Sequence, residues 1–289
     1  MSWVSIDYDR CTNCGICIEG CGRCFYEKEG KVSVSADINC CSICGRCVSL
    51  CPSGAVKHSE MDMENFGKIE RDFFISTDDF IEFLRQRRSH RAFQKKDIPE
   101  PDIRKLVDII RYSPTGSNSQ IVELLVVRNQ EKIKKLSDMT VRVMVNNGME
   151  SEKKARQLRE EGKAGQEEIA VLEMMALYGQ ILKEGSESGQ DPIFYGAPAV
   201  MIFHAPDSGF SKKDDCVIAS TTMGLLSRTM GLEYTYIGLF EGAANSDSAV
   251  MEELGLPAGN NVFSVIILGY PVMKFYRTVD RKPLSVRWE

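Results

Sequence analysis

The chain has no excess of positive charge and no long apolar run, and both absences exclude classes of partner. Its 36 basic and 41 acidic residues leave a formal net charge of −5, so nothing predicts binding to nucleic acid or to an anionic membrane. The longest apolar stretch, from Val262 to Leu268, is too short for a bilayer span, which takes about 20 residues. Residues 1–9 lack the basic start and apolar core of a signal peptide, so we expect a cytoplasmic location.

Cysteine is almost missing from most of the chain, because ten of the 11 cysteines precede residue 52 and only Cys216 follows. Eight of them form two runs with the spacing C-x-x-C-x-x-C-x-x-x-C. The first run is Cys11, Cys14, Cys17 and Cys21, and the second is Cys41, Cys44, Cys47 and Cys51. Thiolates at this spacing are typical ligands of iron–sulfur clusters, so two runs predict two [4Fe–4S] clusters.

In this arrangement the fourth cysteine of each run binds the cluster of the other run. We therefore assign one cluster to Cys11, Cys14, Cys17 and Cys51, and the second to Cys41, Cys44, Cys47 and Cys21. The alternative is structural zinc, which usually takes two cysteine pairs separated by a longer span. The additional Cys24, Cys40 and Cys216 are expected to be small buried hydrophobic side chains. Cys40 stands beside Cys41, and the repeat spacing favours Cys41 as the ligand.

The two runs resemble the bacterial ferredoxin family over about residues 1–60. The resemblance implies a small ferredoxin-like domain that holds two clusters and transfers single electrons. One departure is Gly22, which stands where the family's first run normally carries proline.

The rest of the chain is long enough for a second domain with its own core. We expect domain bounds of 1–60 and 76–289, joined by a charged linker over 61–75. Helices are predicted after Ser76 or Thr77, from about Pro101, and between Asp214 and Gly231. Strands are predicted over Ile121–Arg128, Ala199–His204 and Val262–Leu268, so the domain is α/β or α+β.

Residues 148–190 carry an apolar stripe within a highly charged stretch. Its members are Val171, Met174, Met175, Tyr178 and Leu182. The stripe predicts an amphipathic helix that packs on the core, or alternatively a methionine-rich lid over a substrate pocket.

A cluster that supplies single electrons needs a partner that pairs them before most organic substrates are reduced, and a flavin does this. Arg87, Arg88, Ser89 and Arg91 would suit the flavin's phosphate, although three arginines in five residues also describe a solvated basic face. No strand-linked G-x-G-x-x-G occurs, so the sequence predicts no dedicated nicotinamide-binding domain.

Five segments, in this order, resemble the nitroreductase family of FMN enzymes over about residues 76–289. They are Arg87–Phe93, Tyr112–Gln120, Tyr195–Pro198, Gly231–Leu232 with Tyr236–Gly238, and Arg281–Leu284. The resemblance implies an α+β domain that forms a homodimer with a flavin at each subunit interface. The chain departs from the family's pattern at Ile121, where many members have proline, and at Ile237, where some have glutamate.

The resemblance also implies roles for single residues. Arg87, Arg88, Ser89, Arg91 and Arg281 would hold the phosphate and ribityl chain of FMN. Pro114, Thr115, Gly116 and Asn118 would line the isoalloxazine, reaching it from the partner subunit in many members. Tyr236, Ile237, Gly238 and Leu239 would present backbone groups to the N5 and O4 edge. No side chain is identified as a proton donor.

The two resemblances together predict an enzyme. Reduced ferredoxin, or another low-potential donor, would load the clusters, which reduce FMN, and FMN would reduce a small electrophile such as a nitroaromatic or a quinone. The alternative is an electron-transfer or redox-sensing protein whose flavin domain exchanges electrons with a protein partner.

Overall fold

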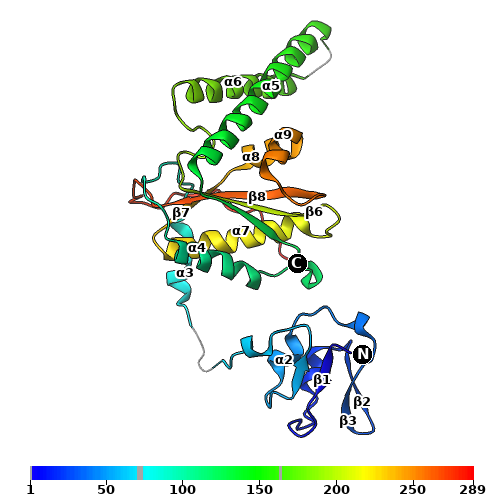
Figure 1. Cartoon of the computed structure of the whole chain (residues 1–289). Coiled ribbons are helices and arrows are strands. Elements are labelled where there is room, and N and C mark those ends of the chain that lie inside the picture. The colour runs from blue at the N-terminus through cyan, green and yellow to red at the C-terminus, as the bar shows by residue number, and fades with distance from the viewer. Residues whose placement is uncertain (1, 70–73, 163–164) are drawn as a thin grey trace. The chain divides into compact units, whose positions relative to one another are not determined.

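The computed structural model describes residues 2–69, 74–162 and 165–289, and the chain divides into two compact units (Figure 1). The N-terminal unit is Met1–Ser76 with Ser117–Ser119, and the C-terminal unit is Thr77–Gly116 with Gln120–Glu289. Part of the predicted linker, residues 70–73, lies outside the described residues. The domain bounds taken from the sequence stay a prediction.

The N-terminal unit repeats one arrangement of strand, helix and strand. The first copy is β1 (Val4–Ile6), α1 (Ile16–Gly20) and β2 (Phe25–Lys28), and the second is β3 (Lys31–Val34), α2 (Arg46–Leu50) and β4 (Val56–His58). Short 3₁₀ helices, η1 (Ile38–Cys40) and η2 (Met63–Asn65), precede α2 and follow β4. Antiparallel pairing joins β1 to β4 and β2 to β3.

The two cysteine runs enter their helices by the same turn. Gly15 and Gly45 precede α1 and α2 with φ of 74° and 69°, a left-handed conformation that glycine adopts without steric cost. The third cysteine of each run therefore lies on a short helix, where Cys17 and Cys47 are buried.

The C-terminal unit is built on a four-stranded antiparallel sheet with the order β5-β6-β8-β7. The strands are β5 (Glu123–Val127), β6 (Ala199–Pro206), β8 (Asn260–Gly269) and β7 (Glu233–Tyr236). Three of them lie on predicted strands, whereas β7 was not predicted. The fold is α+β, because every hydrogen-bonded pair of neighbouring strands in this sheet is antiparallel.

Helices cover both faces of the sheet (Figure 1). One face carries α4 (Glu100–Asp108) and α7 (Lys212–Thr229), and the other carries α8 (Gly238–Ser246) and α9 (Ser248–Leu254). Side chains of β6 alternate between the two cores, since Met201 packs with Met223 of α7 and Ile202 packs with Phe240 of α8. Further elements are α3 (Thr77–Arg85), η3 (Ile109–Tyr112), which packs with α4 and α7, and η4 (Gly116–Asn118).

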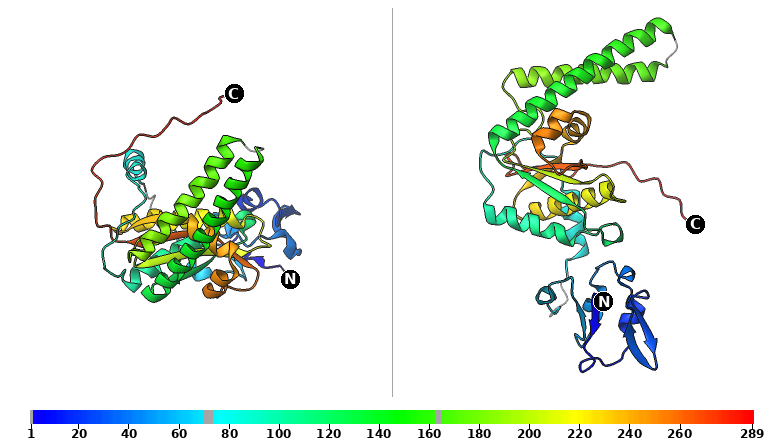
Figure 2. Two further views of the ribbon diagram at one scale, coloured as in Figure 1. Left: turned by 90° about the horizontal axis from the view of Figure 1, so that it is seen from above. Right: turned by 45° about the vertical axis from the view of Figure 1, so that its right-hand side comes forward.

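Two long helices, α5 (Gln130–Glu161) and α6 (Gln166–Glu187), form a hairpin that projects beyond the sheet layers (Figures 1 and 2). Their backbones approach closely, because a Cβ on Gly179 would lie 2.9 Å from the carbonyl oxygen of Met144. No helix among the described residues is long and apolar enough to cross a membrane.

The hairpin corrects the expectation for residues 148–190. The predicted helix would pack on the core, but the structure has two helices that pack mainly on each other, with Leu182 reaching the core of the C-terminal unit, and residues 163–164 lie outside the described chain. The alternative, a methionine-rich lid, stays a prediction. Leu182 is buried, whereas most of the stripe faces outward within the single chain. These exposed members are Val171, Met174, Met175 and Tyr178. The physical reason is that α6 packs against α5 through the face that contains Gly179, so most of the apolar stripe lies on another face.

Alanine at Gly224 of α7 should destabilise the C-terminal unit. The new Cβ would lie 2.6 Å from ring atoms of the buried Tyr234, and overpacking of this kind costs about 1–3 kcal/mol. The gain in helix propensity is at most about 1 kcal/mol, so the net loss should reach about 2 kcal/mol. Gly242 of α8 is the matched control, because its Cβ would meet no atom within 4 Å. Urea midpoints should fall for Gly224→Ala and not for Gly242→Ala; equal midpoints would contradict the packing.

Candidate functional site

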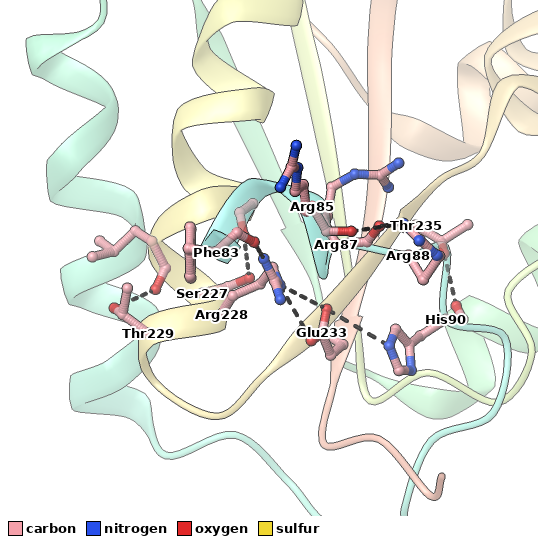
Figure 3. A network of polar contacts seen from close by, with 12 residues as sticks. Phe83, Arg85, Arg87, Arg88, His90, Ser227, Arg228, Thr229, Glu233 and Thr235 are labelled. Atoms are coloured by element: carbon pink, nitrogen blue, oxygen red, sulfur yellow. Dashed lines mark hydrogen bonds and ion pairs between the residues drawn. The ribbon is translucent and has the colours of Figure 1, made fainter. Parts of the chain in front are cut away.

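The arginine-rich segment, residues 87–91, follows the end of α3 and lies along β7. Arg87 and Arg88 are half-buried, whereas Ser89 and Arg91 are exposed. The Thr235 hydroxyl of β7 donates to the carbonyl of His90 at 2.8 Å (Figure 3). The guanidinium of Arg87 lies over the ring of Tyr234, 5.9 Å from its centroid. These contacts place the predicted phosphate residues beside the strand that ends at the predicted flavin-edge turn.

An ion pair lies beside α3, the helix that precedes this segment. The Arg228 Nε, at the end of α7, lies 3.2 Å from Glu233 Oε2 at the start of β7, and the side chains are 7% and 17% exposed. The same guanidinium donates to the carbonyl of Phe83 and stacks over its ring (Figure 3). These contacts join α3 to the end of α7, and removing one partner of the buried pair would leave an uncompensated charge.

His90 lies inside the segment and is largely buried. It is 5% exposed, its Nε2 lies 3.8 Å from Glu233 Oε2, and the Phe275 ring meets it edge to face. Burial lowers the pKa of His90; Glu233 opposes this shift and Arg228 adds to it. His90 is therefore neutral near pH 7. Burial also lowers the pKa values of His58 and His204, so both imidazoles favour the neutral form as well.

The Tyr195–Pro198 segment meets the other end of the arginine-rich segment. The Arg91 guanidinium lies over the Tyr195 ring, 5.8 Å from its centroid. Tyr195 has a φ of 54°, which is uncommon for a large side chain. A Cβ on Gly269 would lie 2.7 Å from both Phe93 and Pro198, so the end of β8 packs tightly here.

The predicted flavin-edge turn joins β7 to α8. Ile237 is buried and its N–H donates to the Val265 carbonyl at 2.9 Å, which fixes the turn to the centre of the sheet. The hydroxyl groups of Tyr236 and Thr221 are 2.7 Å apart. α8 then begins at Gly238 without a side-chain cap, so its first N–H groups are free of side-chain acceptors from the cap position.

The Pro114–Gly116 loop lies at the opposite end of α7. The Gly116 N–H donates to Asp215 Oδ1 at 2.9 Å, near the start of that helix. At a rise of about 1.5 Å per residue, Asp215 and Arg228 are about 20 Å apart along the helix axis. Within one chain, this loop and the arginine-rich segment therefore do not meet. Asn118 follows the loop with a φ of 55°.

Arg281 lies in the C-terminal tail, which leaves the sheet without helix or strand (Figure 2). Its backbone N–H donates to the Asp280 carboxylate at 2.8 Å, and its side chain is exposed. Its predicted role at the phosphate stays a prediction.

A cavity of about 220 Å³ opens in the N-terminal unit between the two cysteine runs. The four cysteines of the second predicted cluster all line it: Cys21, Cys41, Cys44 and Cys47. Burial, and next the charge of Cys21, raise the pKa of Cys47 to about 11. Cys21 of the first run therefore lies close to Cys47 of the second run. These thiols fit a cluster, in which each cysteine binds a different iron. Among the described residues, no three His, Cys, Asp or Glu side chains form a site for a single metal ion.

In the first predicted set, the pKa values of two thiols are shifted in opposite directions. Burial raises the pKa of Cys17, and the nearby Cys11 and Cys14 raise it further. Burial alone would raise the pKa of Cys51 too, but hydrogen bonds from Ser53 and from backbone N–H groups lower it overall. The Ala55 N–H donates to Cys51 Sγ at 3.2 Å. Such donors favour the thiolate, which is the form that binds iron.

Arg228, Glu233 and the contact between Arg91 and Tyr195 were not predicted. Arg91 and Tyr195 lie far apart in the chain, whereas Arg228 and Glu233 are close in sequence and pair across the turn between α7 and β7. The one available signal was the position of Glu233 directly after the Gly231–Leu232 motif.

Comparison with known proteins identifies similar chains. The model of the nitroreductase family matches residues 84–270. A protein of Archaeoglobus fulgidus, named as a candidate NADH dehydrogenase/NAD(P)H nitroreductase, is 24% identical over 207 residues, which cover 70% of this chain and 91% of the relative.

Two solved structures share the fold. A nitroreductase with bound FMN from Bacteroides fragilis is 20% identical, with a TM-score of 0.53 over 72% of this chain and 98% of that one. A second FMN-bound nitroreductase, from Desulfitobacterium hafniense, is 19% identical, with a TM-score of 0.50 over 72% of this chain and 97% of that one.

Proposed function

The chain belongs to the nitroreductase family and is an oxidoreductase, and on that premise we propose that it uses FMN together with two N-terminal [4Fe–4S] clusters. Its substrate would be a small electrophile such as a nitroaromatic compound or a quinone. Electrons would come from reduced ferredoxin or another low-potential donor.

The observation that carries the FMN proposal is the convergence of three motif segments around β7. The arginine-rich segment lies along β7 through Thr235 and Tyr234, and β7 leads directly into the turn at Ile237. The third segment, Tyr195–Pro198, joins them through the contact of the Arg91 guanidinium with the Tyr195 ring. FMN-bound relatives of the same fold support this assignment.

The residues would divide the work by chemistry. Arg87, Arg88, Ser89 and Arg91 would bind the phosphate with charge-assisted and hydroxyl hydrogen bonds. The uncapped N-terminus of α8 would offer N–H groups to the electron-rich edge of the ring. FMN itself supplies the exchange of one or two electrons.

A second copy of the chain would complete the site. The Pro114–Gly116 loop bonds near the start of α7, whereas Phe83 of α3, the helix that precedes the arginine-rich segment, accepts from Arg228 at its end. A homodimer would bring the loop of one subunit to the arginine-rich segment of its partner, and this separation supports the dimer proposal.

The cavity between the cysteine runs supports the cluster proposal, because the predicted ligands of one cluster all line it. A cluster there, and a second held by Cys11, Cys14, Cys17 and Cys51, would supply single-electron transfer. The relative's name raises NAD(P)H as an alternative donor, which would need no N-terminal unit.

The test is the content of iron, sulfide and flavin in protein purified without oxygen. The proposal expects about eight irons with matching sulfide per chain, and about one FMN, as in other flavin enzymes. Zinc in place of iron would contradict the cluster proposal. Iron without flavin would contradict the FMN proposal and leave a carrier.

A further inference from the structure

Cys24 and Cys40 come together in the N-terminal unit although neither belongs to the predicted ligand sets. Their Sγ atoms are 2.6 Å apart. Cys24 is 2% exposed, whereas Cys40 is partly exposed. This corrects part of the expectation of small buried hydrophobic side chains: Cys24 is buried, whereas Cys40 is partly exposed and contacts it. The separation of the two sulfurs is only slightly longer than the covalent S–S bond of about 2.05 Å.

The local structure holds both thiols in place. Cys24 precedes β2, and its carbonyl accepts the Ser35 N–H at 2.8 Å, which continues the β2–β3 hairpin. Cys40 ends η1, which Asp37 caps by accepting the Asn39 N–H at 2.9 Å. The hairpin and the capped turn therefore bring the two thiols together without help from a ligand.

We propose that Cys24 and Cys40 form a reversible redox pair that exchanges with a soluble disulfide. The partly exposed Cys40 thiolate attacks one sulfur of the soluble disulfide R–S–S–R, and one R–S⁻ leaves. The Cys24 thiol then loses its proton and attacks Cys40 Sγ, the second R–S⁻ leaves, and the Cys24–Cys40 bond forms. The two cysteines lose two electrons and two protons, which leave as two R–SH.

The pair stands beside the cavity that the second cluster would occupy, since Cys24 and Cys40 line it together with the predicted ligands. Cys24 follows Cys21 by three residues, and Cys40 precedes Cys41 directly. A two-electron site would thus lie next to a site for single electrons. The inference goes beyond the proposed function, because the contact between the thiols depends on neither FMN nor substrate.

The experiment exposes the full chain, purified without oxygen, to oxidised glutathione at graded ratios to reduced glutathione. After acid quenching, alkylation and trypsin, mass spectrometry seeks a link between peptide 24–28 and peptide 32–46. The second peptide also contains Cys41 and Cys44, so Cys24→Ser and Cys40→Ser variants identify the bond. Cys216→Ser is the control, because it removes a buried cysteine of the other unit.

The proposal expects the link in unsubstituted protein and in Cys216→Ser, its loss with dithiothreitol, and its absence from both pair variants. The pair variants should also keep the iron content of unsubstituted protein. No link at any glutathione ratio, or a link that persists in Cys40→Ser, would overturn the proposal. So would loss of iron in Cys40→Ser, which would make Cys40 a ligand. An iron-free unsubstituted protein would instead count against the proposed function, while the peptide link would still report on the pair.

Discussion

Alanine at Cys44 should remove one cluster, so that iron falls from about eight towards about four per chain. Cys44 lines the cavity with Cys21, Cys41 and Cys47, and its side chain is exposed. The substitution therefore removes a ligand with little loss of packing. Cys14→Ala should do the same for the first cluster, since Cys14 is exposed as well.

The functional consequence is a loss of ferredoxin-driven flavin reduction. Both variants should reduce FMN slowly when reduced ferredoxin is the donor, yet turn over normally when FMN is reduced chemically. Cys216→Ala is the matched control, because Cys216 is buried in the C-terminal unit. Unchanged ferredoxin-driven rates in Cys14→Ala and Cys44→Ala would mean that the N-terminal unit is not the electron path.

Alanine at Arg87 should weaken FMN binding about 10- to 150-fold. Hydrogen bonds to charged groups contribute about 1.5–3 kcal/mol, and about 1.4 kcal/mol corresponds to a tenfold change in the dissociation constant. The FMN affinity of Arg87→Lys should lie between that of unsubstituted protein and that of Arg87→Ala, because an ammonium keeps the charge but loses the planar fork. The contact of Arg87 with the Tyr234 ring contributes only about 0.5–1 kcal/mol, so the fold should persist.

Titration of flavin-free protein with FMN and with riboflavin separates the phosphate contact from a general loss of the site. Arg87→Ala should weaken FMN binding and leave riboflavin, which has no phosphate, nearly unchanged. Arg85→Ala is the control, because Arg85 is an exposed neighbour at the end of α3 outside the predicted set. Equal weakening of both flavins would show that Arg87 acts on something other than the phosphate.

Much of the sheet was predictable because its central strands are buried on both faces. β6 and β8 are continuous apolar runs, which a sequence reveals directly. β7 was missed because it has only four residues, in which polar Glu233 and Thr235 alternate with tyrosines. The α5–α6 hairpin was missed because its helices bury surface against each other, so their apolar stripe does not mark the core.

The candidate site likewise has a part that was predictable from the sequence and a part that was not. Residue type and spacing pointed to the cysteine runs, since thiolates in that pattern suit few other tasks, and to the arginine-rich segment, since guanidinium groups suit a phosphate. The ion pair of Arg228 with Glu233 depends on how α7 and β7 pack, which no local pattern contains. The contact of Cys24 with Cys40 likewise depends on the β2–β3 hairpin, which brings distant positions together.

The separation of the arginine-rich segment and the Pro114–Gly116 loop at opposite ends of α7 predicts how two defective copies of the gene would behave together. If each flavin is bound by the arginine-rich segment of one subunit and the Pro114–Gly116 loop of the other, a defect in either part disables both sites of a uniform dimer. A mixed dimer, with one subunit altered at Arg87 and the other at Gly116, concentrates both defects in one site and leaves the second intact. Two inactive alleles expressed in one cell would then complement each other.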